Sequence, residues 1–247
     1  MSETSPNPWL ALPDQAAGLG VPVAPEACAA LERFHGLLVA ANATTNLTRI
    51  VEPGEAVVKH YLDSLLFLRG IPAARQGEPL RLLDVGAGAG LPGIPLAIVR
   101  PHWWVAMLDA VGKKVAFIRE AAAALGLAHA EGLHGRAEDL GREPAHRDGY
   151  DVVTARALAG LPELLELCLP LVRPGGVLVV SKGAKGPDEL AEASRALALL
   201  RGRVVATQRV SLPDDHGDRH LYVIEKHAPT PREYPRKAGV PHRTPLR

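Results

Sequence analysis

The sequence predicts an α/β fold: a Rossmann-like, seven-stranded, mostly parallel sheet with an antiparallel edge, preceded by a small helical N-terminal region. Three observations predict it. Apolar residues recur at helical spacing in the first 77 residues, short apolar runs alternate with helical segments from Pro79 onward, and a charged turn joins two late apolar runs. Of the 247 residues, 47% are apolar and 22% charged, so the chain can bury a sizeable core.

The N-terminal region, residues 1–77, is expected to contain two amphipathic helices. Apolar residues recur on one helical face at 30–38 and again at 57–66. Pro53 suits the first turn of the second helix, and Gly70 would help to end it.

A linker at 75–77 is expected to lead into a central domain at 78–228, which a C-terminal tail at 229–247 follows. The strands expected in the central domain lie at 80–85, 104–108, around Leu133, and at 151–155, 176–181, 204–210 and 220–226. Its helices are expected at 92–99, 113–125, 161–172 and 187–200. Alternating strands and helices imply a parallel sheet covered on both faces, and the last two strands, joined by the turn at 213–219, imply the antiparallel edge.

A glycine-rich loop follows the first strand. Gly86, Gly88 and Gly90 stand between strand and helix, where the missing Cβ atoms let the backbone approach a ligand. A dinucleotide site would have its third glycine where Leu91 stands, and no phosphate-binding lysine follows. Asp84 would repel a pyrophosphate but attract a sulfonium or ammonium group, so the pattern favours S-adenosylmethionine over an ordinary tight turn.

Two more acids follow later strands. Asp109 ends the second strand, where a carboxylate can accept hydrogen bonds from both ribose hydroxyls, although it could also cap the next helix. Glu138 follows the third strand, where such folds contact adenine; the alternative is a surface charge.

The motifs on either side of these residues resemble one family. They are LDVGAGAGLPGIPLAIVRP at 83–101, LDAVGKKVAFI at 108–118, RAED at 136–139 and TARALAGL at 154–161. Further matches are NLT at 46–48, HYLDS at 60–64, VSKG at 180–183, RHLYVIEK at 219–226 and PTPREYPRKAGVP at 229–241. Over roughly residues 42–247, the chain is similar to the bacterial 16S ribosomal RNA guanine-N7 methyltransferases, also called glucose-inhibited division protein B.

The resemblance implies a class I S-adenosylmethionine-dependent methyltransferase, with residues 78–228 as the cofactor-binding domain. The cofactor contacts that it implies fall on Gly86, Leu91, Asp109, Ala110, Val111, Ala137, Glu138 and Arg156. The loop pattern adds Asp84, Gly88 and Gly90. At position 89 relatives commonly have proline, and the alanine here should be harmless.

The residues present also indicate which class of methyl transfer the chain can catalyse. The segment Thr154-Ala155-Arg156-Ala157 lacks the pattern of amino-adenine and amino-cytosine enzymes, and Cys168 stands in an apolar helix as a core thiol. The run at 214–216 fits a solvated turn better than a metal site, so no metal is expected. Guanine N7 has a lone pair and no proton, so its methylation needs positioning and no general base. Arg156 would orient the reactants; a structural salt bridge is the alternative.

Ribosomal RNA binding would need cations and a stacking ring. The candidates are Arg49, Lys182, Lys185, Arg219, Arg232, Tyr234, Arg236 and Lys237. His60 and Asp63, one helical turn apart, would support the pocket or serve only packing or capping. The tail is either an RNA-binding arm, whose deletion spares the cofactor, or a solvated proline-rich segment.

The expected partner is 16S ribosomal RNA, in the small subunit or an assembly intermediate, with no DNA and no membrane. The N-terminus has no signal-peptide layout and the two cysteines are far apart in the sequence, so a cytoplasmic monomer is expected. The net charge of +1 leaves open a small-molecule N- or O-methyltransferase. A non-catalytic cofactor-binding assembly factor is a further alternative.

Overall fold

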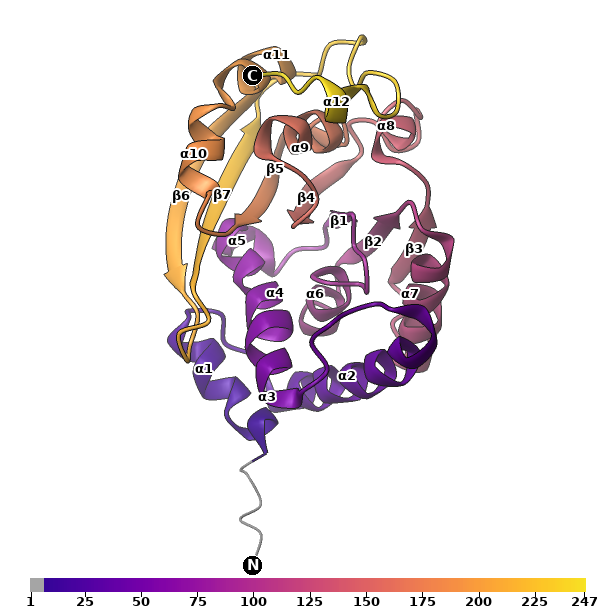
Figure 1. Ribbon diagram of the computed structural model, residues 1–247, viewed down its shortest axis with the longest axis vertical. Coiled ribbons are helices and arrows are strands. Elements are labelled where there is room, and N and C mark those ends of the chain that lie inside the picture. Colours follow the sequence, from indigo (N-terminus) through magenta and orange to yellow (C-terminus); the bar gives the residue numbers. More distant parts are fainter. Residues whose placement is uncertain (1–6) are drawn as a thin grey trace, which may run out of the picture.

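The computed structural model describes residues 7–247, so the first six residues of the expected N-terminal region lie outside it (Figure 1). Its seven strands form one sheet in the order β3-β2-β1-β4-β5-β7-β6. The first five strands pair in parallel, whereas β7 is antiparallel to both β5 and β6. The predicted mixed sheet with an antiparallel edge is therefore confirmed. Across residues 7–247, every helix is too short or too polar to traverse a bilayer.

The strands lie close to their predicted positions. They are β1 Arg81–Val85, β2 Trp104–Asp109, β3 Ala130–His134, β4 Tyr150–Arg156, β5 Val172–Lys182, β6 Gly202–Ser211 and β7 Asp218–Lys226. Because β1 and β4 are neighbours at the centre of the sheet, the connections after them leave its carboxyl edge on opposite faces, which opens a crevice there.

The N-terminal region is helical but less regular than expected. Its elements are η1 Pro8–Leu10, α1 Leu12–Gly18, α2 Pro25–Thr45, α3 Pro53–Ala56, η2 Val57–Leu62, α4 Asp63–Leu65, η3 Leu66–Gly70 and α5 Ala73–Gln76. The single helix predicted at 57–66 is instead a π-helical turn, η2, followed by one α-helical and one 3₁₀ turn. The linker expected at 75–77 is also partly wrong: Gln76 lies in α5 and its side chain donates hydrogen bonds to the carbonyls of Leu68 and Ile71.

The helices of the central domain differ from prediction in two places. They are α6 Gly93–Val99, α7 Gly112–Ala124, α8 Ala137–Leu140, α9 Leu161–Cys168, α10 Gly186–Ala191 and α11 Ser194–Leu200. The helix expected to run to Val172 ends at Cys168, because Val172 already pairs with Tyr150 in the sheet. The helix expected at 187–200 is split into α10 and α11.

Two apolar layers cover the sheet, and neighbouring residues of one strand face opposite layers. Leu82 packs into the layer formed with α2, α6 and α7, whereas Leu83 packs into the layer formed with α9 and α11. Figure 1 shows α2, α4 and α6 on one side of the strands and α8, α9 and α11 on the other. Cys28 and Cys168 are buried free thiols, one in each layer.

The C-terminal segment lies on the second layer. It contains the short helix α12, Val240–Arg243, next to α8 and α9 (Figure 1). Pro235, Pro241 and Leu246 are buried, and Leu246 belongs to the same apolar cluster as α9. The alternative of a solvated tail is therefore wrong, because this segment supplies part of the core.

Candidate functional site

The glycine loop adopts the backbone that the sequence pattern suggests. Gly86, Gly88 and Gly90 have φ of 73°, 58° and 81°, which L side chains rarely adopt. A Cβ on Gly86 would come within 2.5 Å of Leu158, and one on Gly90 within 2.7 Å of Ile94. A Cβ on Gly88 would meet nothing closer than 4.0 Å. The loop is therefore packed against protein at Gly86 and Gly90 and faces open space at Gly88.

Asp84 lies beneath this loop and is 1% exposed. Its carboxylate accepts hydrogen bonds from the backbone N–H of Gly93 at 2.9 Å and from the hydroxyl of Thr154 at 3.0 Å. Burial raises the pKa of Asp84 to about 7, although these two hydrogen bonds oppose the rise. Asp84 thus ties β1 to the start of α6 and to β4, and it supports the loop from below.

Asp109 anchors the loop from the second strand. One carboxylate oxygen accepts the N–H of Gly88 at 2.9 Å and the other accepts the N–H of Val111 at 2.8 Å. Its side chain does not cap α7, whose N-cap residue is Val111. Since each carboxylate oxygen can accept a second hydrogen bond, Asp109 retains capacity for ligand hydroxyls.

A cavity of about 310 Å³ opens beside this loop, at the carboxyl ends of β1, β2 and β3. Five of the residues predicted to contact the cofactor line it: Gly86, Asp109, Ala110, Ala137 and Glu138. Glu138 is buried, so the alternative of a surface charge is wrong. The other predicted contacts, Asp84, Gly88, Gly90, Leu91, Val111 and Arg156, are not among its lining residues.

This first cavity also contains residues that the sequence did not point to. Among them are Leu158 and Leu167, from the β4–α9 loop and α9, and Gly239 and His242 from the C-terminal segment. The leucines have no local signal, because an apolar residue near a helix is usually core. Gly239 and His242 lie far along the chain and could not have been assigned to this place without the fold.

The residues of the first cavity fit S-adenosylmethionine. The carboxylates of Asp109 and Glu138 can accept hydrogen bonds from ribose hydroxyls and an adenine amino group, and Ala137, Leu158 and Leu167 can pack against a purine. The open space at Gly88 allows close approach of the backbone. The hydrogen-bond acceptors and the space therefore suit an adenosyl group.

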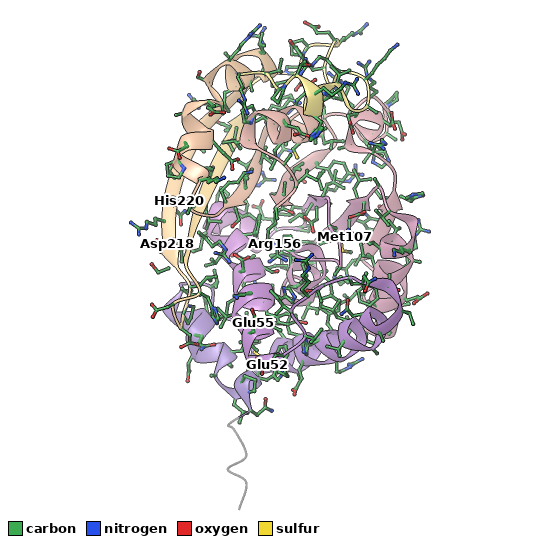
Figure 2. All side chains as sticks on the ribbon, viewed as in Figure 1. Glu52, Glu55, Met107, Arg156, Asp218 and His220 are labelled. Carbon is green, nitrogen blue, oxygen red and sulfur yellow. The ribbon has the colours of Figure 1, made fainter. Side chains whose placement is uncertain are left out.

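A second cavity, of about 600 Å³, lies at the ends of β4 and β5. Five predicted site residues line it: His60, Asp63, Arg156, Lys182 and Arg219. Leu158 lines both cavities, so they adjoin at this side chain. Figure 2 shows Arg156 near the middle of the molecule, between Met107 of β2 and His220 of β7 in that view.

Asp63 connects the two arginines of the second cavity. Its buried carboxylate accepts from Arg156 Nη1 at 3.1 Å through one oxygen and from Arg219 Nε at 2.9 Å through the other. The salt bridge foreseen as an alternative for Arg156 is therefore present. Because a bound guanidinium has further N–H groups, Arg156 keeps donors for a ligand.

Two further titratable residues of the second cavity, His60 and Lys182, also have partners within the protein. His60 is buried in the π-helical turn, with Nε2 2.9 Å from the hydroxyl of Thr48. Burial, assisted by the charge of Arg156, lowers the pKa of His60 to about 4, so the imidazole is neutral at pH 7. Lys182 pairs with Glu189 at 2.8 Å and donates to the carbonyl of Ala159.

The predicted RNA-binding residues outside this cavity fall into two groups. Arg49 and Lys185 are exposed. Both lie near this cavity in the chain, because Arg49 precedes the lining residue Ile50 and Lys185 stands two residues after the lining residue Gly183. In the C-terminal segment, the side chains of Arg232 and Lys237 are exposed, whereas Tyr234 packs against the second apolar layer and Arg236 pairs with Glu166 at 2.6 Å. Arg236 thus has a partner inside the protein.

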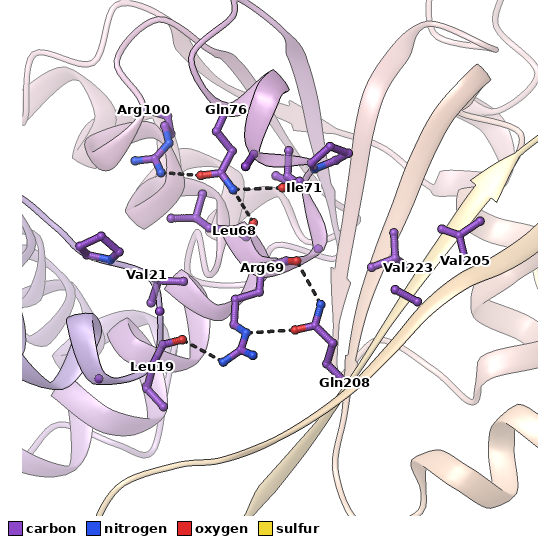
Figure 3. Close-up of a pocket in the computed structure, with 17 residues that line it drawn as sticks. Leu19, Val21, Leu68, Arg69, Ile71, Gln76, Arg100, Val205, Gln208 and Val223 are labelled. Atoms are coloured by element: carbon purple, nitrogen blue, oxygen red, sulfur yellow. Dashed lines mark hydrogen bonds between the residues drawn. The ribbon is translucent and has the colours of Figure 1, made fainter.

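A further cavity, of about 780 Å³, lies between α1, η3 and the β6–β7 pair (Figure 3). Arg69 donates to Gln208 at 3.0 Å and to the carbonyl of Leu19 at 2.9 Å, and Arg100 donates to Gln76 at 2.8 Å. These polar side chains are bound to one another and to backbone. None of the residues that line this cavity belongs to the glycine loop.

Comparison with solved structures supports the fold. The [4+2]-cyclase SpnF superposes with a TM-score of 0.54 at 16% identity, covering 85% of this chain and 99% of that one. A predicted O-methyltransferase from Agrobacterium tumefaciens gives a TM-score of 0.53 at 21% identity, covering 67% and 81%. At these identities the likeness concerns the fold alone.

Comparison with sequences is more specific. The model of the family described as rRNA small subunit methyltransferase G matches residues 27–222. The ribosomal RNA small subunit methyltransferase G of Deinococcus radiodurans is 45% identical over 228 residues, covering 92% of this chain and 88% of the relative. That of Geobacillus thermodenitrificans is 42% identical over 229 residues, covering 92% and 94%. The chain therefore belongs to the rRNA small subunit methyltransferase G family and is an S-adenosylmethionine-dependent methyltransferase.

Proposed function

We propose that this protein methylates the N7 atom of a guanine in the 16S ribosomal RNA of the small subunit. The observation that carries the proposal is the pair of adjoining cavities. One suits an adenosyl group, and the other is lined by Arg156, Arg219 and Lys182. Membership in a family named for small-subunit ribosomal RNA supports the same substrate.

The first cavity would hold the cofactor. Asp109 would accept from the ribose hydroxyls, Glu138 from the adenine amino group, and Leu158 and Leu167 would pack against the purine. The open face of the loop at Gly88 would meet the remainder of the molecule. S-adenosylmethionine, when bound, supplies a methyl group on a positively charged sulfur and a neutral leaving group.

The second cavity would hold the guanine. Arginine can donate two hydrogen bonds to the guanine edge or to a phosphate. Asp63 fixes the guanidiniums of both Arg156 and Arg219, so their free N–H groups have set directions. Oriented donors of this kind lower the entropic cost of placing N7 in line with the methyl group.

The titratable groups around the second cavity agree with transfer that needs no base. N7 carries a lone pair and no proton, so nothing has to be removed before attack. His60, with a pKa of about 4, is neutral and in contact with Thr48, and Asp63 is engaged by two arginines. Asp84 has a pKa of about 7 but is buried below the loop and lines neither cavity.

The decisive test uses small subunits from cells that lack this protein. Incubation with tritiated S-adenosylmethionine should label their 16S RNA, and mass spectrometry should identify one 7-methylguanine. The matched control is a subunit reconstituted with 7-deazaguanine at that position, which has no N7 lone pair and should accept no methyl group. Label on a small molecule only, or cofactor binding without transfer, would support one of the two alternative functions instead.

The pH dependence of single-turnover transfer tests the absence of a base. The rate should be flat between about pH 6.5 and 8.5, because no proton leaves guanine N7. Asp84 is the group to check, because its pKa of about 7 falls in this range. An inflection in this range that disappears in one variant, such as Asp84→Asn, would contradict base-free transfer.

A further inference from the structure

The C-terminal segment 229–247, called the strap below, is bound to the central domain along most of its length. Arg147 donates to the carbonyls of Thr230 at 2.7 Å and Tyr234 at 2.8 Å, and Arg142 donates to that of Pro235 at 2.5 Å. Two arginines of the α8–β4 connection thus bind the backbone of the strap.

One ion pair fixes the middle of the strap to α9. The carboxylate of Glu166 is 0% exposed and receives the Arg236 guanidinium at 2.6 Å and its backbone N–H at 2.8 Å. A carboxylate at such a depth requires a partner, and the strap supplies it. Beyond it, Leu246 enters the apolar layer and Arg247 pairs with Glu192 at 3.3 Å.

Between these two attachments, the strap passes over the first cavity. Gly239 and His242 line the cavity together with Glu138. The N–H of Gly239 donates to Oε1 of Glu138 at 3.0 Å. Gly239 has a φ of 78°, a conformation that glycine adopts without strain. Within residues 7–247, Oε2 of Glu138 makes no hydrogen bond, so this oxygen has capacity for a ligand donor.

We propose that the strap is a structural wall of the cofactor site, in which Gly239 positions the carboxylate of Glu138 for the amino group of the adenine. The inference rests on the placement of the adenosyl group in the first cavity. It makes the strap and the cofactor mutually stabilising, because each is in contact with Glu138 and the same cavity. A strap that served only RNA would leave cofactor affinity unchanged when removed.

Two truncations separate this wall from the rest of the strap. A chain ending at Ala238 keeps Arg236 on Glu166 and the bonds from Arg142 and Arg147, but lacks Gly239 and His242. A chain ending at Arg243 keeps both lining residues. It loses the terminal attachment through Leu246 and Arg247, together with Thr244, whose carbonyl accepts from Arg236 Nη2 at 2.8 Å. Circular dichroism and melting curves verify that each truncated chain is folded.

The measurement is the dissociation constant of S-adenosylhomocysteine by calorimetry, without RNA. The chain ending at Ala238 should bind it about tenfold more weakly or worse, as expected for the loss of one hydrogen bond to a charged group. The chain ending at Arg243 should bind within about twofold of the full chain. Glu138→Gln in the full chain should also weaken binding, because an amide nitrogen cannot accept from the adenine amino group.

Hydrogen exchange provides a second readout in the full-length protein. S-adenosylhomocysteine should slow exchange at the amides of Gly239, Val240, His242 and Arg243, which a wall in contact with the ligand requires. Wild-type affinity in the chain ending at Ala238, or equal weakening in both truncations, would overturn the proposal. Because these assays contain no RNA, normal cofactor binding with no transfer to 16S RNA would refute the proposed substrate and leave this inference standing.

Discussion

The carboxylate of Asp63 holds the guanidinium of Arg156 at 3.1 Å, and its other oxygen holds Arg219 at 2.9 Å. One buried acid of the N-terminal region thus connects the carboxyl end of β4 to the antiparallel strand β7. The N-terminal helices therefore contribute directly to the second cavity. Their attachment to the central domain at this point is ionic as well as apolar.

Replacing Asp63 with asparagine should damage both stability and RNA methylation. The change keeps the side-chain volume but leaves two partly buried guanidiniums without a counter-charge, so the free energy of unfolding should fall by about 2–4 kcal/mol. Urea unfolding measures the loss. Glu225→Gln, which breaks the exposed pair with Arg203, is the matched control and should cost less than about 1 kcal/mol. Equal losses in the two variants would refute the bridging role.

Arg156→Lys should separate positioning from cofactor binding. Lysine keeps the charge but lacks the planar fork that can contact Asp63 and a ligand together. The single-turnover rate on small subunits should fall about tenfold or more, because orientation is lost. The dissociation constant of S-adenosylhomocysteine should change much less, since Arg156 lines only the second cavity. A variant that transfers methyl groups normally would exclude Arg156 from orientation.

His60 should make the protein less stable in mild acid. Its pKa is about 4 in the folded protein and near 6.5 in the unfolded chain, so between these values the unfolded chain binds more protons. Stability from this group is complete above about pH 6.5 and declines as the pH falls toward 4. Between pH 7.5 and 5 it should contribute a loss of about 2 kcal/mol. Urea unfolding of the wild type and His60→Gln at both pH values measures it, and parallel pH trends would contradict the prediction.

Alanine substitutions at Gly93 and Gly88 should affect different properties: stability at Gly93 and cofactor binding at Gly88. A Cβ on Gly93 would lie 2.3 Å from Met107 Cγ and 3.1 Å from an Asp84 oxygen, so Gly93→Ala should cost about 1–3 kcal/mol of stability through overpacking. A Cβ on Gly88 points into open space, so Gly88→Ala should lower stability by only about 1 kcal/mol, because of the positive φ at this position. Its main effect should be weaker binding of the cofactor. Melting curves and cofactor titrations of both variants test this difference.

The Arg236–Glu166 pair should be more costly to break than to remove. Arg236→Ala leaves the Glu166 carboxylate buried without a counter-charge and should lower the free energy of unfolding by about 3–5 kcal/mol. Adding Glu166→Leu should restore much of that loss, because no buried charge is left unpaired. Chemical denaturation of the two variants measures both steps. A double variant as unstable as Arg236→Ala would show that the strap depends on other contacts.

The local features of this protein were predictable from the sequence because they depend on residues close together in the chain. Largely apolar runs of five to seven residues indicated six of the strands, whereas the third was placed only around Leu133. Three alternating glycines after the first strand indicated the ligand-binding loop. The acids Asp109 and Glu138 were recognised by their positions just after strands. Five predicted cofactor residues line one cavity because the carboxyl ends of parallel strands meet at one edge of a sheet.

The partners of these residues were decided only by the tertiary structure. Asp63 lies 93 residues from Arg156 and 156 from Arg219, and Gly239 lies 101 residues from Glu138. Charge and periodicity cannot say which of 28 basic residues meets a given buried carboxylate, because that depends on how the layers pack. For the same reason, a proline-rich basic tail could be taken for a solvated segment or an RNA arm. The sequence alone determined the sheet and its ligand-binding edge, whereas folding brought the N-terminal helices and the strap to that edge as walls of the two cavities.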